Sequence, residues 1–232
     1  MRLAWAVLAL LPLVPAKARA AQEPETRARQ ILAGSSVHER IGPIETPLST
    51  QLADFLLDHP DLAASIVREH GIAPYVISMR GPRQSWADDG DGTVGLITET
   101  VREDGRRVYY GDGTHHSRLF PDIRAEAVIV MEMGPQPRRG CSEHVRSTFE
   151  VYVRLRNPVL ARMVSVLPFV RKTIVRKFSK AFLVADQVGR LIAKTPQAVV
   201  WDVRDFGLPE AEEARALGLI GALTAQPLSC RD

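Results

Sequence analysis

The sequence predicts an α+β fold in which two short helices, a run of antiparallel strands and one long helix follow one another. Three observations predict it. Residues 145–155 place mostly apolar side chains at odd positions and mostly polar ones at even positions, as in a strand with one buried face. Asp104-Gly105 lies between two strand-like segments and is a strong hairpin signal. An amphipathic helical pattern then extends over residues 168–194.

The helix pair comes first. Ser49 or Thr50 can cap a helix whose apolar residues are Leu52, Phe55 and Leu56. His59-Pro60 ends this helix, and a second short helix continues to a stop at Gly71.

The strands follow the helix pair. Short apolar or alternating segments separated by turn residues are typical of an antiparallel meander. The predicted strands cover residues 75–79, 93–102, 106–111, 124–133 and 145–155.

The long helix contains Pro168, which a helix interior does not tolerate without a kink, so the segment is divided into 159–167 and 168–194. Thr195-Pro196 ends it. The tail is expected to contain a strand at Val199–Val203 and a last amphipathic helix over 209–224.

The first 20 residues are typical of a secretory signal peptide. Arg2 precedes an apolar run over residues 3–16, and Ala18-Arg19-Ala20 is a small-residue cleavage signature. We expect cleavage near Ala20 and export to the periplasm or the extracellular space. An uncleaved membrane anchor is the alternative.

The remaining chain divides by composition. Residues 21–47 are polar and contain three prolines, so a linker is expected there. Residues 48–196 hold the main elements and form the predicted domain. Residues 197–232 are expected to be a C-terminal extension that packs on this domain.

The charge balance argues against a nucleic-acid partner. The formal net charge of +3 comes from 30 Lys and Arg and 27 Asp and Glu residues. Residues 1–20 contain three of the basic residues and no acidic one, so the mature chain has 27 of each and a formal charge of zero. A general attraction to polyanions is therefore not expected.

Basic residues instead gather on one face of the long helix. They include Lys172, Arg176, Lys177 and Lys180. This face could contact an anionic membrane surface or an acidic partner. The alternative is a solvated face paired with acidic residues of the same domain.

The order of elements resembles the START-like, or helix-grip, superfamily. In that fold an antiparallel sheet wraps around a long C-terminal helix, and two short helices precede it. Segments 49–70, 75–156 and 168–194 match these parts by order and pattern. The resemblance implies an antiparallel β-sheet of four to six strands wrapped around the long helix, with the short helix pair before the sheet. The superfamily usually has a strand before the helix pair, for which residues 31–44 are a poor candidate.

The resemblance also implies a cavity between sheet and helix, which many such proteins use for a lipid or another apolar molecule. Large residues of the strand face and the helix stripe would line it. They are Phe149, Val151, Val153, Leu155, Ile174, Phe178 and Phe182. The alternative is that these residues form a filled core, because protein interiors are close-packed.

No catalytic motif is complete. The sequence contains no Gly-x-Ser-x-Gly elbow, phosphate-binding glycine loop or His-Glu-x-x-His motif. His116, His144 and Glu150 are the candidate acid–base groups if the cavity is an active site.

A metal site is not predicted, and no cofactor is expected. The segment Asp88–Thr93 departs from the EF-hand pattern and is interpreted as a solvated turn, with an irregular calcium turn as the alternative. Asp112, His115, His116 and His144 do not form a ligand set with suitable spacing. Cys141 and Cys230 could pair as a disulfide after export, or remain free thiols.

The leading interpretation is an exported soluble carrier or sensor that binds an apolar ligand, a lipid being the class that the resemblance implies. An alternative is a periplasmic enzyme, hydrolase-like or cyclase-like, that uses the same cavity. A third hypothesis is a packed scaffold that acts through protein partners.

Overall fold

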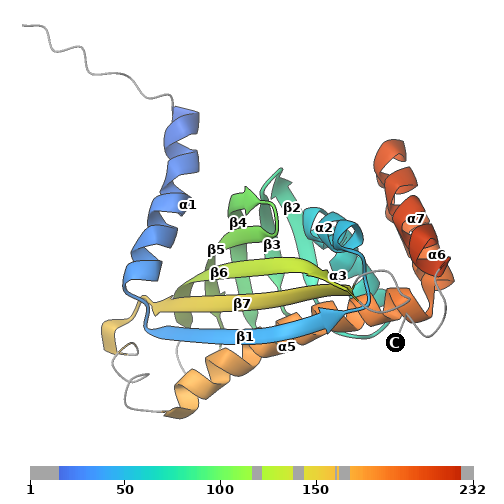
Figure 1. The fold of residues 1–232 in the computed structure, drawn as a ribbon. Helices are drawn as coiled ribbons and strands as arrows, with labels where there is room; N and C mark the ends of the chain where they lie inside the picture. The colour runs from blue at the N-terminus through green and yellow to red at the C-terminus, as the bar shows by residue number, and fades with distance from the viewer. Residues whose placement is uncertain (1–15, 117–121, 138–143, 160, 162–167, 226–232) are drawn as a thin grey trace, which may run out of the picture.

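The protein is described from a computed structural model, which covers residues 16–116, 122–137, 144–159, 161 and 168–225. Figure 1 shows its helices and strands. The described residues form six helices and seven strands. In chain order the elements are α1 (Ala16–Ala33), β1 (Val37–Thr46), α2 (Thr50–Asp58), α3 (Pro60–Glu69), β2 (Val76–Gly81), β3 (Gln84–Asp88), β4 (Thr93–Glu103), β5 (Arg106–His115), β6 (Ile123–Gln136), β7 (His144–Leu155), α5 (Pro168–Lys194), α6 (Pro196–Phe206) and α7 (Glu210–Thr224).

The sheet is antiparallel throughout, in the order β1-β7-β6-β5-β4-β3-β2. The predicted α+β fold is confirmed, with seven strands where four to six were expected. The Asp104-Gly105 hairpin is confirmed too. Glu103 pairs with Arg106, and Gly105 has a φ of 67°, which a residue without Cβ adopts at little cost.

The two faces of the sheet carry different helices. The inner face, to which the odd-numbered residues of β7 belong, is turned toward α5. The outer face is partly covered by α1, whose Ala28 and Ile31 pack against Val108 and Val128. Figure 1 shows α1 at one end of the molecule and α6 and α7 at the other.

Local sequence explains the helix pair. The Ser49 side chain accepts a hydrogen bond from the Leu52 backbone N–H at 3.2 Å and caps α2. Pro60 begins α3, where its missing N–H is not needed. Both helices therefore begin close to their predicted positions.

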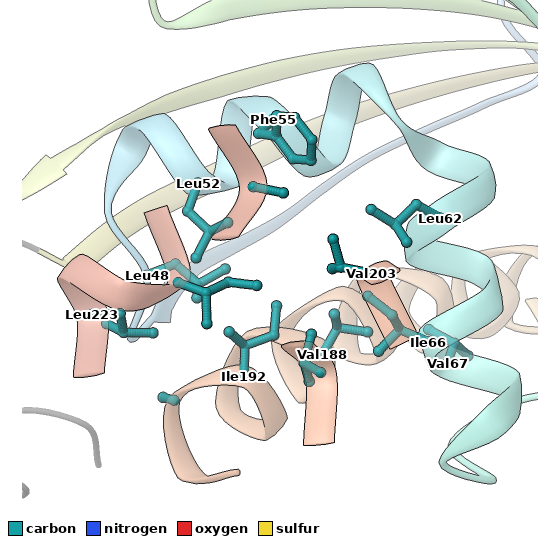
Figure 2. Packing of buried hydrophobic residues seen from close by; sticks show 14 of the residues in the cluster. Leu48, Leu52, Phe55, Leu62, Ile66, Val67, Val188, Ile192, Val203 and Leu223 are labelled. Atoms are coloured by element: carbon teal, nitrogen blue, oxygen red, sulfur yellow. The ribbon is translucent and has the colours of Figure 1, made fainter. Parts of the chain in front are cut away.

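The largest core cluster lies at the helical end of the molecule, where α2, α3, α6 and α7 surround the C-terminal half of α5 (Figure 2). Ile192 and Val199 are completely buried in it. α6 and α7 supply Val203, Ile220 and Leu223 to this same cluster. Residues 196–224 therefore share a core with α2 and α3.

The linker prediction for residues 21–47 is wrong. Most of this segment forms α1 and β1, and β1 is the edge strand that pairs with β7. Its alternation is interrupted at Gly42-Pro43, where the register shifts between Ile41 and Ile44. The alternating pattern of β1 is weak, so the strand is stabilised by its pairing with β7 and by the burial of Val37.

The predicted strand at Val199–Val203 is wrong as well. This segment lies inside helix α6, which begins at Pro196 and ends before Gly207 with a φ of 81°. Val199 and Val203 are one helical turn apart and enter the core together, so tertiary packing overrides the β propensity of the valines. The short strand β3 was not predicted.

Candidate functional site

The inner face of the sheet and helix α5 bring the predicted ligand-binding residues together. Val151, Val153 and Leu155 of β7 are buried in one cluster, against which Ile174 and Phe178 of α5 pack. Phe149 stacks on Phe182 with ring centroids 3.8 Å apart and an interplanar angle of 12°. A role of these residues in ligand contact stays a prediction.

The middle of the inner face is lined by very small residues. In register, Gly111 of β5 lies opposite Ala127 of β6, and Gly113 lies opposite Ala125. Gly113 also pairs with Gly95 of β4. Since directly paired residues point to the same face, these positions form a low floor beneath α5.

Among the described residues, this floor is open at Gly111. A Cβ atom built at Gly111 would have one described neighbour within 4 Å, the Ala127 carbonyl oxygen at 4.0 Å. Ala125, Ala127 and Ile129 are only half-buried although β6 is a central strand. The floor was not predicted, because glycine and alanine carry no functional group that would indicate a binding surface in the sequence.

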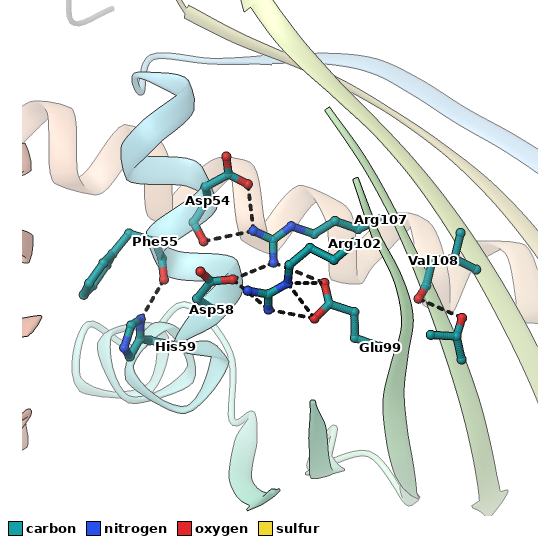
Figure 3. A network of polar contacts seen from close by, with 9 residues as sticks. Asp54, Phe55, Asp58, His59, Glu99, Arg102, Arg107 and Val108 are labelled. Atoms are coloured by element: carbon teal, nitrogen blue, oxygen red, sulfur yellow. Dashed lines mark hydrogen bonds and ion pairs between the residues drawn. The ribbon is translucent and has the colours of Figure 1, made fainter. Parts of the chain in front are cut away.

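A charged network closes the end of the inner face that is next to α2 (Figure 3). Arg107 of β5 donates to Asp54 and Asp58 of α2, each at 2.7 Å, and lies 3.4 Å from Glu99 of β4. Arg102 binds both Glu99 oxygens, at 3.0 Å and 2.7 Å. The network attaches α2 to the sheet.

Burial alone would lower the pKa of Arg107, but its hydrogen bonds to Asp58 and Asp54 outweigh burial and raise the pKa. The guanidinium therefore stays charged although its side chain is only 7% exposed. Buried charges require such partners, because an uncompensated one is costly.

Tyr109 lies between this network and the glycine floor. Its hydroxyl is buried and makes no hydrogen bond of ordinary geometry within the described part of the chain. Burial raises the pKa of Tyr109 to about 12, while the nearby positive charge of Arg107 acts in the opposite direction. The phenol is therefore neutral under physiological conditions.

Lys177 decides between the two interpretations of the basic face at its own position. Lys177 was expected either to contact a membrane surface or acidic partner or to pair with acidic residues of the same domain, and its ammonium group contacts four oxygen atoms at the β3–β4 turn of this domain. They are Asp89 Oδ2 at 3.0 Å, Asp91 Oδ2 at 3.1 Å, the Asp91 carbonyl at 3.2 Å and Thr93 Oγ1 at 3.1 Å. We call this contact the Lys177 clamp, because it joins α5 to the far side of the sheet.

Burial alone would raise the pKa of Asp89. Hydrogen bonds from the backbone and side chain of Thr93, from Asp91 and from Lys177 together outweigh burial and lower it. The Lys177 clamp thus holds an ionised carboxylate. Across the described residues, no group of three or more His, Cys, Asp and Glu side chains is arranged to hold a metal ion.

The candidate acid–base groups do not converge. His116 is exposed after β5 and pairs with Asp122 at 3.0 Å. His144 is buried at the start of β7, at the opposite end of the sheet. Glu150 lies on the outer face, where its Oε2 accepts a hydrogen bond from the Tyr152 hydroxyl at 2.7 Å. These three residues therefore do not share one site, and an acid–base role for any of them stays a prediction.

The other predicted residues have separate positions. Lys172, Arg176 and Lys180 are exposed on α5. Cys141 and Cys230 lie outside the described residues, as does most of the helix predicted at 159–167. Within the described ranges, no helix combines the length and the hydropathy needed to cross a membrane.

The seven-stranded antiparallel sheet and its long C-terminal helix define a helix-grip-like α+β protein. Two solved structures are similar to it. One is a conserved protein from Geobacillus kaustophilus, at 14% identity and a TM-score of 0.45, with 67% of this chain and 97% of that chain covered. The other is Ara h 8.0201, at 9% identity and a TM-score of 0.40, with 66% and 93% covered.

Ara h 8 is a Bet v 1-like protein of the helix-grip superfamily. No protein-family profile and no curated protein sequence matches the chain. Identities and TM-scores this low describe a weak likeness of fold, and no function is taken from them.

Proposed function

We propose that the protein is exported and binds an apolar ligand, a lipid, between the inner face of the sheet and helix α5, as a carrier or sensor. The observation that carries this proposal is the open position above Gly111, in the centre of the inner face. A native core is filled to the density of an organic crystal, so a gap there is an exception that calls for an occupant.

The surroundings of that position favour an apolar occupant. Ala125, Ala127 and Ile129 form the floor, and Ile174 and Phe178 belong to the helix that faces it. A hydrocarbon chain would remove these half-buried surfaces from water, at about 25 cal/mol for each Å². Ligand pockets of this kind are mostly apolar with a few polar groups at their ends.

The outer side of α5 supports delivery to a membrane surface. Lys172, Arg176 and Lys180 are exposed, and none of the three forms an ion pair with another described residue. Leu183 on the same helix is 54% exposed. Each basic residue close to an anionic bilayer contributes about 1 kcal/mol of attraction.

Export rests on the sequence of residues 1–20. Amino-terminal sequencing of the protein recovered from the periplasmic or culture fraction checks it. A mature chain that begins near Ala21 is expected, whereas full-length protein confined to the cytoplasm would exclude export.

A matched pair of glycine substitutions tests ligand binding. Gly111→Leu places a side chain in the proposed ligand position. Gly134→Leu is the control, because Gly134 lies on the outer face of β6 and an added Cβ there meets no described atom within 4 Å. Displacement of a fluorescent fatty acid measures affinity, and native mass spectrometry of protein purified from its source detects a bound lipid.

We expect Gly111→Leu to weaken fatty-acid binding at least about tenfold, since one leucine occupies the volume of several methylene groups. Gly134→Leu should bind as the wild type does. A wild-type protein that binds no fatty acid and carries no lipid would contradict the proposal and favour the packed scaffold.

A further inference from the structure

The hydroxyl group of Tyr109 is buried on the inner face of the sheet without a hydrogen-bond partner. Within the described part of the chain, it is the one buried side-chain nitrogen or oxygen atom of which this is true. Buried polar atoms are paired in the great majority of cases, because an unpaired one loses its hydrogen bonds to water without compensation. The hydroxyl of Tyr109 therefore calls for an acceptor that the described chain does not provide.

The charged groups beside Tyr109 do not use its hydrogen. Glu99 lies directly opposite Tyr109 in the strand register, but its carboxylate oxygens accept hydrogen bonds from Arg102 and Arg107 instead. A guanidinium group can only donate, so Arg107 offers no acceptor to the phenol. Because burial raises the pKa of Tyr109 to about 12, the phenol keeps this hydrogen at neutral pH and remains a donor.

Tyr109 lies between the charged network and the open position above Gly111. The two residues are separated by one position on β5, so they belong to the same face of the sheet. Their Cα atoms are roughly 7 Å apart, which is about the length of a tyrosine side chain. On β6, Tyr109 pairs with the half-buried Ile129 and Gly111 pairs with Ala127. A molecule lying over Gly111 thus has Tyr109 beside one of its ends.

The charge of this end disfavours an anionic head group. The network contains the two guanidinium groups of Arg102 and Arg107 and the three carboxylates of Asp54, Asp58 and Glu99. Two positive and three negative groups give it a formal charge of −1, and both guanidinium groups already bind these carboxylates. A carboxylate or phosphate brought to Tyr109 would lose its water without gaining a cation of its own.

The opposite end of the glycine floor is no better suited to an anion. There the β3–β4 turn meets the end of β5, two residues beyond Gly113. Lys177 lies at this end, and its ammonium group is held by the carboxylates of Asp89 and Asp91 at 3.0 Å and 3.1 Å. An acidic ligand would have to displace one of these carboxylates, whereas an uncharged ligand leaves them in place.

We propose that the ligand of the lipid site has an uncharged head group with an oxygen atom, as in a long-chain alcohol or ester, and that this oxygen accepts the hydrogen of the Tyr109 hydroxyl. This inference rests on the lipid site of the proposed function. The head group lies beside the charged network, and the hydrocarbon chain extends over Gly111 and Gly113 toward the β3–β4 turn. Tyr109 thus selects the head group and sets the orientation of the lipid.

The test compares ligands that share one chain and differ in the head group. The full mature chain is loaded with N-phenyl-1-naphthylamine, a neutral fluorescent probe without an oxygen atom, which is then displaced by 1-dodecanol, methyl dodecanoate or dodecanoate. At about pH 8 the acid is ionised. We expect the alcohol and the ester to bind at least about tenfold more tightly than the ionised acid, because the acid brings an uncompensated charge to the site.

Tyr109→Phe should weaken binding of the alcohol and the ester about tenfold, because their oxygen loses its donor. Binding of the probe should stay unchanged, which checks that the site is intact. Tyr110→Phe is the matched control, since Tyr110 faces the outer side and donates its hydroxyl hydrogen to Glu126 at 2.8 Å. In the infrared spectrum, the carbonyl band of bound methyl dodecanoate should shift to higher frequency in Tyr109→Phe and stay in place in Tyr110→Phe.

Dodecanoate that binds as tightly as the alcohol would overturn the head-group assignment and leave the lipid site itself standing. An unchanged affinity in Tyr109→Phe, or a carbonyl band that does not move, would have the same consequence. If neither the probe nor any of the three ligands binds the wild type, the lipid site fails and this inference fails with it. Gly111→Leu should weaken all of them, including the probe, because its side chain occupies the place of the hydrocarbon chain.

Discussion

The two halves of helix α5 have different surroundings. In the C-terminal half, Val184, Val188 and Ile192 are buried among α2, α3, α6 and α7. In the N-terminal half, Ile174 and Phe178 are only half-buried against the sheet. One helix is therefore a core element at one end and a cover over the sheet at the other.

Two glycines show how far the difference goes. A Cβ atom at Gly189, in the C-terminal half of α5, would lie 2.0 Å from Thr46 Cγ2 and 3.2 Å from Leu48. A Cβ atom added at Gly111, on the inner face of the sheet, would lie in open space. The molecule separates a tightly packed end from a more loosely packed region, which is where we propose that a ligand binds.

A matched pair of truncations should give the largest effect. Ile192→Ala leaves a cavity in the packed end, because Ile192 has no exposed surface, and it should cost about 3 kcal/mol of unfolding free energy. Ile174→Ala should cost less than about 1 kcal/mol, since this side chain is already half-exposed. Urea unfolding measures both. Equal losses would contradict the distinction between the two halves of α5.

A pH effect of intermediate size is expected from Tyr109. The unfolded chain loses this phenolic proton near the ordinary pKa of 10.0, while the folded protein keeps it to about 12. Its contribution to stability is thus fully present below pH 10 and is lost as the pH rises to 12. The loss is roughly 2 kcal/mol.

Tyr109→Phe isolates that contribution, because other tyrosines titrate equally in both proteins. The stability of the wild type relative to the variant should fall across this pH range, as measured by urea unfolding at each pH. At neutral pH the variant should be at least as stable, since the hydroxyl has no hydrogen-bond partner among the described residues. A difference that stays constant with pH would refute the assignment.

The smallest effect is expected from the Lys177 clamp. Lys177→Met should cost about 1 kcal/mol, because the side chain is 29% exposed and its ion pairs are partly screened by water. Hydrogen exchange should accelerate in the N-terminal half of α5 and stay unchanged in the C-terminal half. Lys172→Met, which removes an exposed lysine of the same helix, is the control.

The acid limit of the Lys177 clamp follows from Asp89. Its pKa lies below the ordinary value of 3.8 in the folded protein, so the stabilisation is present above that value and is lost only as the pH falls below it. The effect of Lys177→Met should therefore be the same at about pH 5 and pH 7. A marked decrease at pH 5 would show that another group controls the clamp.

The elements that the sequence predicted are those with an unbroken local pattern. The alternation in β7 and the apolar stripe of α5 each extend over more than ten residues, so neighbouring positions support the same assignment. β1 was missed because Gly42-Pro43 divides its pattern. α6 was taken for a strand because Val199, Val200 and Val203 favour β structure when read without their tertiary contacts.

The site was predicted only in part, for a related reason. The apolar side chains of β7 were assigned to the correct face, whereas Glu150 was listed as a candidate for the cavity although its even position indicated the outer side. Contacts between distant segments have no local signal. Arg107 meets Asp54 and Asp58 of α2, and Lys177 meets a turn that lies 86 to 88 residues earlier. The position above Gly111 is open because no described side chain fills it. No sequence pattern predicts such a gap.

The pairing of β1 with β7 constrains how the chain reaches its native state. Val37 pairs with Val153, so the edge strand from the beginning of the domain joins the sheet only after the last strand exists. Such non-local pairing slows folding, because the entropy cost of closing a long loop comes before the contacts between the strands can stabilise the structure. Until β1 arrives, the edge of β7 exposes unpaired N–H and C=O groups that another chain can bind. The newly made protein is thus most prone to aggregation in the interval before this last strand is added.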